Sequence, residues 1–215
     1  MHATRIIAIR HGETAWNVDT RIQGHLDIPL NDTGLWQARQ VALALAGEPI
    51  AAVYTSDLQR AHATAKAVAD AAGAPLTTDL GLRERSFGHF QGRTFAEIEA
   101  ELPEDARRWR KRDPHYAPDG GESLVALRER IARTVTQLAE RHLGEQVVMV
   151  AHGGVLDVIY RLATRQDIQA PRTWQLANAA INRLLWTEDG LTLVGWADTQ
   201  HLDHPDHAAR DETHS

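Results

Sequence analysis

The segment IIAIRHGETAWN, residues 6–17, begins with four apolar residues and passes without a break into Arg10 and His11. An apolar run this short and this uniform predicts a strand that is buried on both faces. A buried strand has no structural reason to end in an arginine and a histidine. These two side chains therefore indicate that the strand leads to a ligand.

Two further predicted strands end in polar residues of the same kind. Residues 146–150 form an apolar run that is followed closely by His152 and two glycines. Residues 50–54 form another, and Arg60 lies at the start of the helix predicted behind it. Because ligands of open parallel sheets bind beyond the carboxyl ends of the strands, we expect two histidines and two arginines to converge at one edge.

Helical patterns alternate with the strands. The predicted helices cover residues 32–45, 58–72, 94–102, 103–113 and 123–144, and another follows His152. A short strand is predicted at 76–79, and strands at 181–186 and 191–196 flank Asp189-Gly190, which is typical of a hairpin. This alternation predicts an α/β fold of three layers, α/β/α, with a mostly parallel sheet and an antiparallel edge strand.

The predicted elements form a single domain over residues 1–202. Residues from about 85 to 122 interrupt the alternation, and we interpret them as a small helical insert that forms a cap over the active site. Residues 203–215 are polar and rich in histidine, so we expect a flexible tail.

Composition excludes several classes of protein. The formal net charge of -6 does not favour nucleic acid or an anionic membrane as a partner. The absence of cysteine excludes disulfides and thiol catalysis. No apolar run approaches the roughly 20 residues of a membrane span. We therefore expect a cytoplasmic protein without a signal peptide, and no pattern indicates an oligomeric state.

The converging residues suit one kind of chemistry. Two guanidinium groups and two imidazoles would bind a phosphate dianion, and the glycines after each histidine let the backbone approach it. A neutral imidazole in such a pocket is a good nucleophile toward phosphorus, while the cations stabilise the phosphoryl group during its transfer. The residues alone therefore predict phosphoryl transfer.

Six blocks of sequence carry a resemblance to a known family. In chain order they are RHGETAWN (10–17), RIQGHLDIPLNDTGLWQA (21–38), YTSDLQRAHATA (54–65), LRERSFGHFQG (82–92), PDGGES (118–123) and VAHGG (150–154). In these blocks the chain resembles the histidine phosphatase superfamily, which includes cofactor-dependent phosphoglycerate mutases, broad-specificity acid phosphatases and α-ribazole phosphatases. The similarity runs from residue 5 to about residue 200.

The resemblance implies a role for each matching residue. His11 would accept the phosphoryl group, and Arg10 and Arg60 would bind its oxygens. His152 would donate a hydrogen bond to the same group, and Glu84 would protonate the leaving alcohol and later take a proton from water. A phosphate dianion beside Glu84 favours its protonated form. The substrate-binding positions implied are Asn17, Gln23, Gly24 and Gly153. The reaction needs no metal or other cofactor.

We weighed four functions. The favoured one is a phosphatase acting on a small phosphomonoester, and the alternative is a phosphoglycerate mutase that uses the same phosphohistidine chemistry. Mutases carry a longer insert with an Arg-Arg-Ser-Tyr-type block, whereas here Arg107-Arg108 is followed by Trp109-Arg110. A non-catalytic binding module would not need Glu84. A metal hydrolase is the weakest hypothesis, and its ligands would be His11, Glu13, His25, Asp27 and His152.

The insert holds the candidate residues for recognising the alcohol. We expect four aromatic side chains to line that part of the pocket: Phe87, Phe90, Trp109 and Tyr116. The basic run 107–112 is more readily explained as a solvated helix face paired with acidic residues upstream than as a grip on the substrate.

Overall fold

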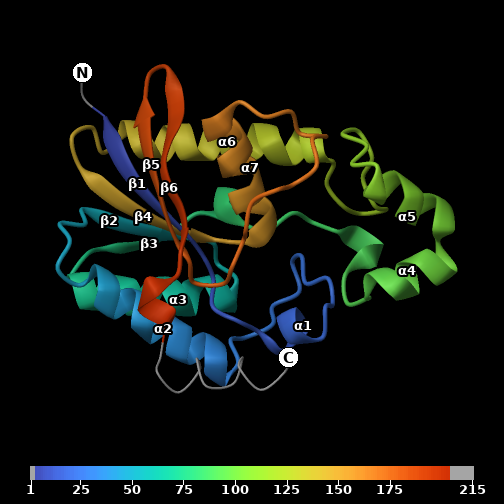
Figure 1. Ribbon diagram of the computed structural model, residues 1–215, viewed down its shortest axis with the longest axis horizontal. Helices are drawn as coiled ribbons and strands as arrows, with labels where there is room; N and C mark the ends of the chain where they lie inside the picture. Colours follow the sequence, from blue (N-terminus) through green and yellow to red (C-terminus); the bar gives the residue numbers. More distant parts are fainter. Residues whose placement is uncertain (1–2, 204–215) are drawn as a thin grey trace.

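The computed structural model describes residues 3–203 and contains one six-stranded sheet in this part of the chain (Figure 1). The strands are β1 (Thr4–Arg10), β2 (Ala52–Thr55), β3 (Leu76–Thr78), β4 (Gln146–Ala151), β5 (Ile181–Thr187) and β6 (Gly190–Asp198). Their order is β3-β2-β4-β1-β5-β6. The first four in this order pair in parallel, and the hairpin β5–β6 adds the antiparallel edge. The carboxyl ends of β1, β2 and β4 therefore meet at one edge of the sheet.

Helices cover both faces of the sheet, which explains why the central strands β1, β2 and β4 are largely apolar and buried. On one face, Ile7 and Ile9 pack in a core with α2 (Asp32–Leu45) and α3 (Gln59–Ala72). On the other face, Ile6 and Ala8 pack with α6 (Leu124–Glu140) and α7 (Gly153–Thr164). Successive side chains of β1 point to opposite faces, so each face needs its own apolar residues. Figure 1 shows these helix pairs on the two sides of the sheet.

Capping residues place the helix ends close to the predicted positions. The side chains of Asn31 and Ser123 accept hydrogen bonds from the first turns of α2 and α6. Gly73, in the left-handed conformation at φ 63°, ends α3. The predicted end of α6 at Gly144 is wrong, because the helix ends at Glu140. Residues 141–144 instead form the turn that brings the chain back into β4.

The insert forms a small helical cap beside the sheet. It contains α4 (Phe95–Glu101), which begins with the predicted capping box, and α5 (Pro103–Arg110). The cap has its own core of four buried residues, namely Phe90, Ile98, Ala106 and Tyr116. Figure 1 shows α4 and α5 set apart from the sheet layers.

Four short elements complete the described chain, and none of them was predicted. They are α1 (Ala15–Val18) and the 3-10 helices Leu80–Leu82, Gly88–Phe90 and Gln200–Leu202.

The predicted α/β architecture is confirmed, including the mostly parallel sheet and the antiparallel edge. No helix among residues 3–203 is long and apolar enough to cross a membrane. The predicted tail falls almost entirely on residues 204–215, which lie outside the described residues. The division into a single domain stays a prediction, as does the cytoplasmic location.

Candidate active site

His11 is buried at the carboxyl end of β1, where its backbone N–H donates to the carbonyl of Ala151 on β4. Its ring Nδ1 lies 2.6 Å from the carbonyl oxygen of Gly12. A carbonyl only accepts hydrogen bonds, so Nδ1 carries the proton and Nε2 keeps its lone pair. Burial, reinforced by the charges of Arg10 and Arg60, lowers the pKa of His11 well below its usual value. The imidazole is therefore neutral and presents Nε2 as a nucleophile.

His152 lies at the N-cap of α7, and its ring centroid is 5.2 Å from that of His11. Its Nε2 is 2.6 Å from the hydroxyl of Ser56, and its buried Nδ1 has no hydrogen-bond partner within residues 3–203. Burial, followed by the effect of His11, lowers the pKa of His152 well below its usual value. Two neutral imidazoles thus lie side by side with hydrogen-bonding capacity left for a ligand.

Arg60 is buried and Arg10 is partly buried, and the charges of both act on His11. Carbonyl oxygens hold each guanidinium in place. Arg10 donates to the carbonyl of Leu176 at 2.6 Å. Arg60 donates to the carbonyls of Leu26 and Gly24, at 2.8 Å and 2.7 Å. The Nε atoms of both arginines are buried and have no partner in the described chain. Each guanidinium is therefore fixed in place with at least its Nε donor still unused.

Glu84 is held rigidly by two backbone N–H groups. Its Oε1 accepts from Arg85 at 2.7 Å, and its Oε2 accepts from Gly154, at the N-terminus of α7, at 3.0 Å. Burial lowers the pKa of Arg10 and Arg60, and the negative charge of Glu84 partly offsets this effect on both. The carboxylate is thus placed within electrostatic reach of the two arginines, at the start of the helix that follows His152.

Gly154 has no side chain because Glu84 occupies the space. A Cβ on Gly154 would lie 2.4 Å from Glu84 Oε1, which no real contact allows. The segment that carries Glu84 is also fixed by Arg130, which donates to the carbonyls of Gly81 and Arg83. The ring of His25 lies 2.8 Å from the carbonyl oxygen of Glu84.

The predicted substrate-binding residues lie around the first turn after His11. Thr14 joins Asn17 and Gln23, because its N–H donates to Asn17 and its hydroxyl lies 3.0 Å from the side-chain oxygen of Gln23. Gly24 follows with φ 53°, the left-handed conformation that favours glycine. Gly153 lines the cavity beside Arg10. The structure brings these residues next to the site, and their contacts with substrate stay a prediction.

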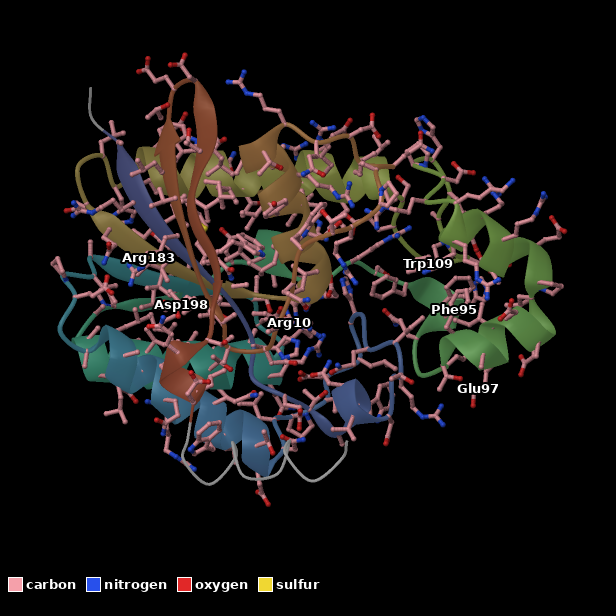
Figure 2. The ribbon with its side chains drawn as sticks, viewed as in Figure 1. Arg10, Phe95, Glu97, Trp109, Arg183 and Asp198 are labelled. Carbon is pink, nitrogen blue, oxygen red and sulfur yellow. The ribbon has the colours of Figure 1, made fainter. Side chains whose placement is uncertain are left out.

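A cavity of about 480 Å³ opens next to Arg10, between the sheet and the cap. It is lined by Arg10, Arg85, Phe87, Trp109, Arg112, Leu124, Leu127, Gly153, Gly154, Asp157, Arg172, Gln175, Leu176 and Ala177. Figure 2 shows two of these residues, Arg10 near the helices under the sheet and Trp109 in the cap. The cavity adjoins the site through Arg10 and through Gly153 and Gly154, which follow His152 at the start of α7.

Two of the aromatic predictions are wrong. Phe87 and Trp109 line the cavity as expected, but Phe90 and Tyr116 are buried in the core of the cap. Both residues pack against the same small group of apolar side chains, which the insert needs for its own stability. Sequence alone does not distinguish an aromatic residue that fills a core from one that faces a ligand.

The basic run 107–112 is mostly a solvated face, as expected. Arg107 pairs with Glu104 and Arg110 with Glu99 on the outside of the cap. Arg112 is the exception, because it turns toward α7 and donates to Asp157 at the wall of the cavity.

Sequence reasoning missed several residues that support the site. Ser56, which contacts His152, stands in a quoted block but carried no assigned role. Asn178 donates to the carbonyl of His11 at 2.8 Å and approaches Asn17. Arg172 lies on the cavity wall in the same loop region, between α7 and β5. That region has no periodicity, so no local signal pointed to these last two residues.

The residues that the metal-hydrolase hypothesis would use as ligands do not form a cluster in the described part of the chain. Among residues 3–203, no three histidine, aspartate or glutamate side chains lie together in an arrangement that would hold a metal ion. Glu13 accepts a hydrogen bond from Asn31, and Asp27 accepts two from Gln59. These carboxylates thus hold loops and a helix start.

Comparison with known proteins identifies the family. Residues 6–199 match the histidine phosphatase superfamily (branch 1). This chain belongs to that superfamily. Similar curated proteins from Arabidopsis thaliana are phosphoglycerate mutase-like protein 4, 39% identical over 92% of this chain and 86% of the relative, and a metal-independent phosphoserine phosphatase, 37% identical over 93% and 83%.

A solved structure, Bacillus stearothermophilus YhfR, has a TM-score of 0.85 and 29% identity, and the match covers 93% of this chain and 100% of that one. The family, the fold and the assignment to the phosphatase class predicted from the sequence are confirmed.

The lowered pKa of His11 predicts a broad acidic range of activity. The neutral imidazole is the reactive form, so protonation of His11 in acid would remove the nucleophile. Because burial and two cations hold its pKa well below 6.5, the acidic limb of kcat/KM that belongs to His11 should lie below pH 6.5. Replacing Arg60 with glutamine removes one of the cations and should shift this limb upward. A wild-type limb centred at or above 6.5 in a p-nitrophenyl phosphate profile would contradict the assignment.

Proposed function

We propose that this enzyme hydrolyses a small phosphomonoester through a phosphohistidine at His11, with Glu84 as general acid and base. The observation that carries the proposal is the orientation of His11. Its Nδ1–H is bound to the carbonyl of Gly12, which leaves Nε2 unprotonated beside two arginines. An imidazole kept neutral among cations is arranged to attack an anion that those cations attract.

The reaction proceeds in two balanced steps. In the first, Nε2 of His11 attacks phosphorus, the bond from phosphorus to the ester oxygen breaks, and Glu84 gives its proton to the departing alkoxide. In the second, water attacks phosphorus and gives a proton to the Glu84 carboxylate. The bond from phosphorus to nitrogen then breaks, and inorganic phosphate leaves with His11 restored.

The cations and His152 act on the phosphoryl group in both steps. Arg10 and Arg60 each keep an unused Nε, and His152 keeps an unused Nδ1, all buried near the nucleophile. Fixed donors of this kind stabilise charge on the transferring group without reorganising. Ser56 fixes the ring of His152 and so orients its remaining nitrogen.

The role of His11 is tested by replacing it. His11→Ala should abolish turnover, because it removes the Nε2 atom that attacks phosphorus, whereas one ring nitrogen of His152 is already engaged by Ser56. Wild-type enzyme should carry phosphate on His11 during turnover. Peptide mapping would show this if the reaction is stopped with a denaturant at neutral or alkaline pH, because acid hydrolyses phosphohistidine. Phosphate on His152 instead, or near-normal activity of the variant, would refute this role.

The role of Glu84 is tested with two leaving groups. An alkyl alkoxide needs a proton to leave, whereas p-nitrophenolate departs unaided. Glu84→Gln should therefore lose about 10²–10⁴-fold in single-turnover rate on glycerol phosphate and clearly less on p-nitrophenyl phosphate. Arg60→Ala should slow both substrates about equally, because it acts on the group they share.

The control for this comparison is Glu129→Gln, on the exposed side of α6, which should change neither rate. Equal losses for Glu84→Gln on both substrates would leave Glu84 a binding or structural residue and the acid unidentified.

A phosphoglycerate mutase is the second candidate, because one of the similar proteins is a phosphoglycerate mutase-like protein. A mutase must return the phosphoryl group to a bound glycerate before water reaches phosphohistidine. The α-helices of the cap, α4 and α5, are both short, and the cavity opens beside Arg10. We expect the release of inorganic phosphate from 3-phosphoglycerate to exceed its conversion to 2-phosphoglycerate. A faster interconversion, measured with and without 2,3-bisphosphoglycerate, would favour the mutase.

A further inference from the structure

The cavity is lined by more arginines than binding of a single phosphoryl group requires. Besides Arg10, three arginines line its walls, namely Arg85, Arg112 and Arg172. They come from three separate segments: the loop after Glu84, the end of the basic run, and the loop before β5. Asp157 is the one acidic residue among the described lining residues. The wall of the cavity therefore carries an excess of positive charge.

Asp157 does not neutralise this excess. Its Oδ2 accepts from Arg112 at 3.0 Å and from Arg161 on the same helix at 2.9 Å. Its Oδ1 has no partner in the described chain but is closed off from solvent. One carboxylate is thus shared between two guanidinium groups. Arg10 and Arg85 are influenced by Glu84 from a distance, but among residues 3–203 neither they nor Arg172 forms a direct ion pair with an acidic side chain.

Arg172 is the most exposed of the lining arginines. It makes no hydrogen bond or ion pair with any other residue between 3 and 203, yet it lies close enough to act on its neighbours. Burial lowers the pKa of Arg10 and Arg112, and the charge of Arg172 lowers both further. The nearby carboxylates, Asp157 beside Arg112 and Glu84 near Arg10, offset only part of this repulsion between like charges, and a bound anion would relieve more of it.

Arg85 forms the floor of the same region. It donates to the carbonyls of Glu122 and Tyr116, and its guanidinium lies 4.6 Å from the ring centroid of Trp109. Burial lowers its pKa to about 10, so it remains charged at neutral pH. It is a fixed cation stacked on an aromatic wall.

We propose that the cavity binds a second anionic group, carried by the alcohol portion of the substrate. This inference rests on the proposed function: the phosphoryl group lies at His11, and a carboxylate or second phosphate on the alcohol contacts Arg112 and Arg172. Planar guanidinium groups suit both kinds of oxyanion. Phe87 and Trp109 would pack against the carbon skeleton between the two anions. A volume of about 480 Å³ suits a small, doubly anionic ester.

The same charges work against an ammonium group. An amino-acid ester would bring its positive charge among the lining arginines, and the one carboxylate there is already shared by two partners. The enzyme should therefore prefer an anionic ester whose alcohol has a hydroxyl where a phosphoamino acid has an ammonium group.

Esters of one three-carbon skeleton separate these effects. Glycerol 3-phosphate lacks the second anion, 3-phosphoglycerate carries a carboxylate in its place, and glycerol 1,3-bisphosphate carries a second phosphate. Phosphoserine differs from 3-phosphoglycerate only in having an ammonium group instead of a hydroxyl. Initial release of inorganic phosphate gives kcat/KM for each ester, and p-nitrophenyl phosphate reports the basal chemistry.

Wild-type enzyme should prefer one of the doubly anionic esters over glycerol 3-phosphate by about tenfold or more, the factor expected for a charge-assisted hydrogen bond. The better of the two identifies the anion as a carboxylate or a phosphate. 3-Phosphoglycerate should also be preferred over phosphoserine. Arg172→Gln should remove most of the preference for the second anion, measured as the ratio of kcat/KM for the better doubly anionic ester to that for glycerol 3-phosphate.

The matched control is Arg107→Gln, in the same basic run as Arg112 but paired with Glu104 on the outside of the cap. It should keep the wild-type preference. Equal kcat/KM for glycerol 3-phosphate and both doubly anionic esters, or a preference that survives Arg172→Gln, would overturn the inference. Wild-type enzyme that releases no phosphate from any ester would instead refute the proposed function, so the two failures are distinguishable.

Discussion

Two neutral imidazoles packed against two guanidinium groups at the carboxyl ends of β1 and β4 are the constraint on which the rest of the structure depends. Charged groups in a poorly solvated site are costly unless partners compensate them. Carbonyl oxygens supply that compensation, from Leu176 for Arg10 and from Gly24 and Leu26 for Arg60. The sheet fixes His11 through its hydrogen bond to Ala151. The loops around the site therefore take conformations that direct carbonyl oxygens at the buried guanidinium groups.

The same constraint explains why glycine stands at position 12. A Cβ on Gly12 would lie 2.5 Å from the carbonyl oxygen of Gly34, in the first turn of α2. The chain leaving β1 must pass directly under that helix so that the carbonyl of Gly12 meets the ring of His11. The N–H of Gly12 is meanwhile bound by Thr64 of α3. The backbone of Gly34 on one side and the hydroxyl of Thr64 on the other thus fix the carbonyl of Gly12 that sets the tautomer of His11.

Much of this arrangement could be predicted from the sequence because it is local. The apolar strands 6–9 and 146–150 each lead into a histidine, and the topology of a parallel sheet brings the two together. The walls of the cavity depend on tertiary packing instead. Phe90 and Trp109 look alike in sequence, yet one fills the core of the cap and the other faces the cavity. Arg172 and Asn178 lie in an irregular loop whose position only the folded chain defines.

Arg112 shows how the cap is joined to the body of the enzyme. It adopts φ 50°, a left-handed conformation that costs a non-glycine residue on the order of 1 kcal/mol. This turn directs its side chain back to Asp157 on α7 and to the carbonyl of Ile168. Asp157 is itself held by the buried Arg161, so the ion pair joins the cap to a rigid helix that begins at His152. The strained residue is held by a charge network that also lines the cavity. The shape of this cavity wall is therefore coupled to the position of the cap, whereas His11 and His152 are held by the ends of the strands.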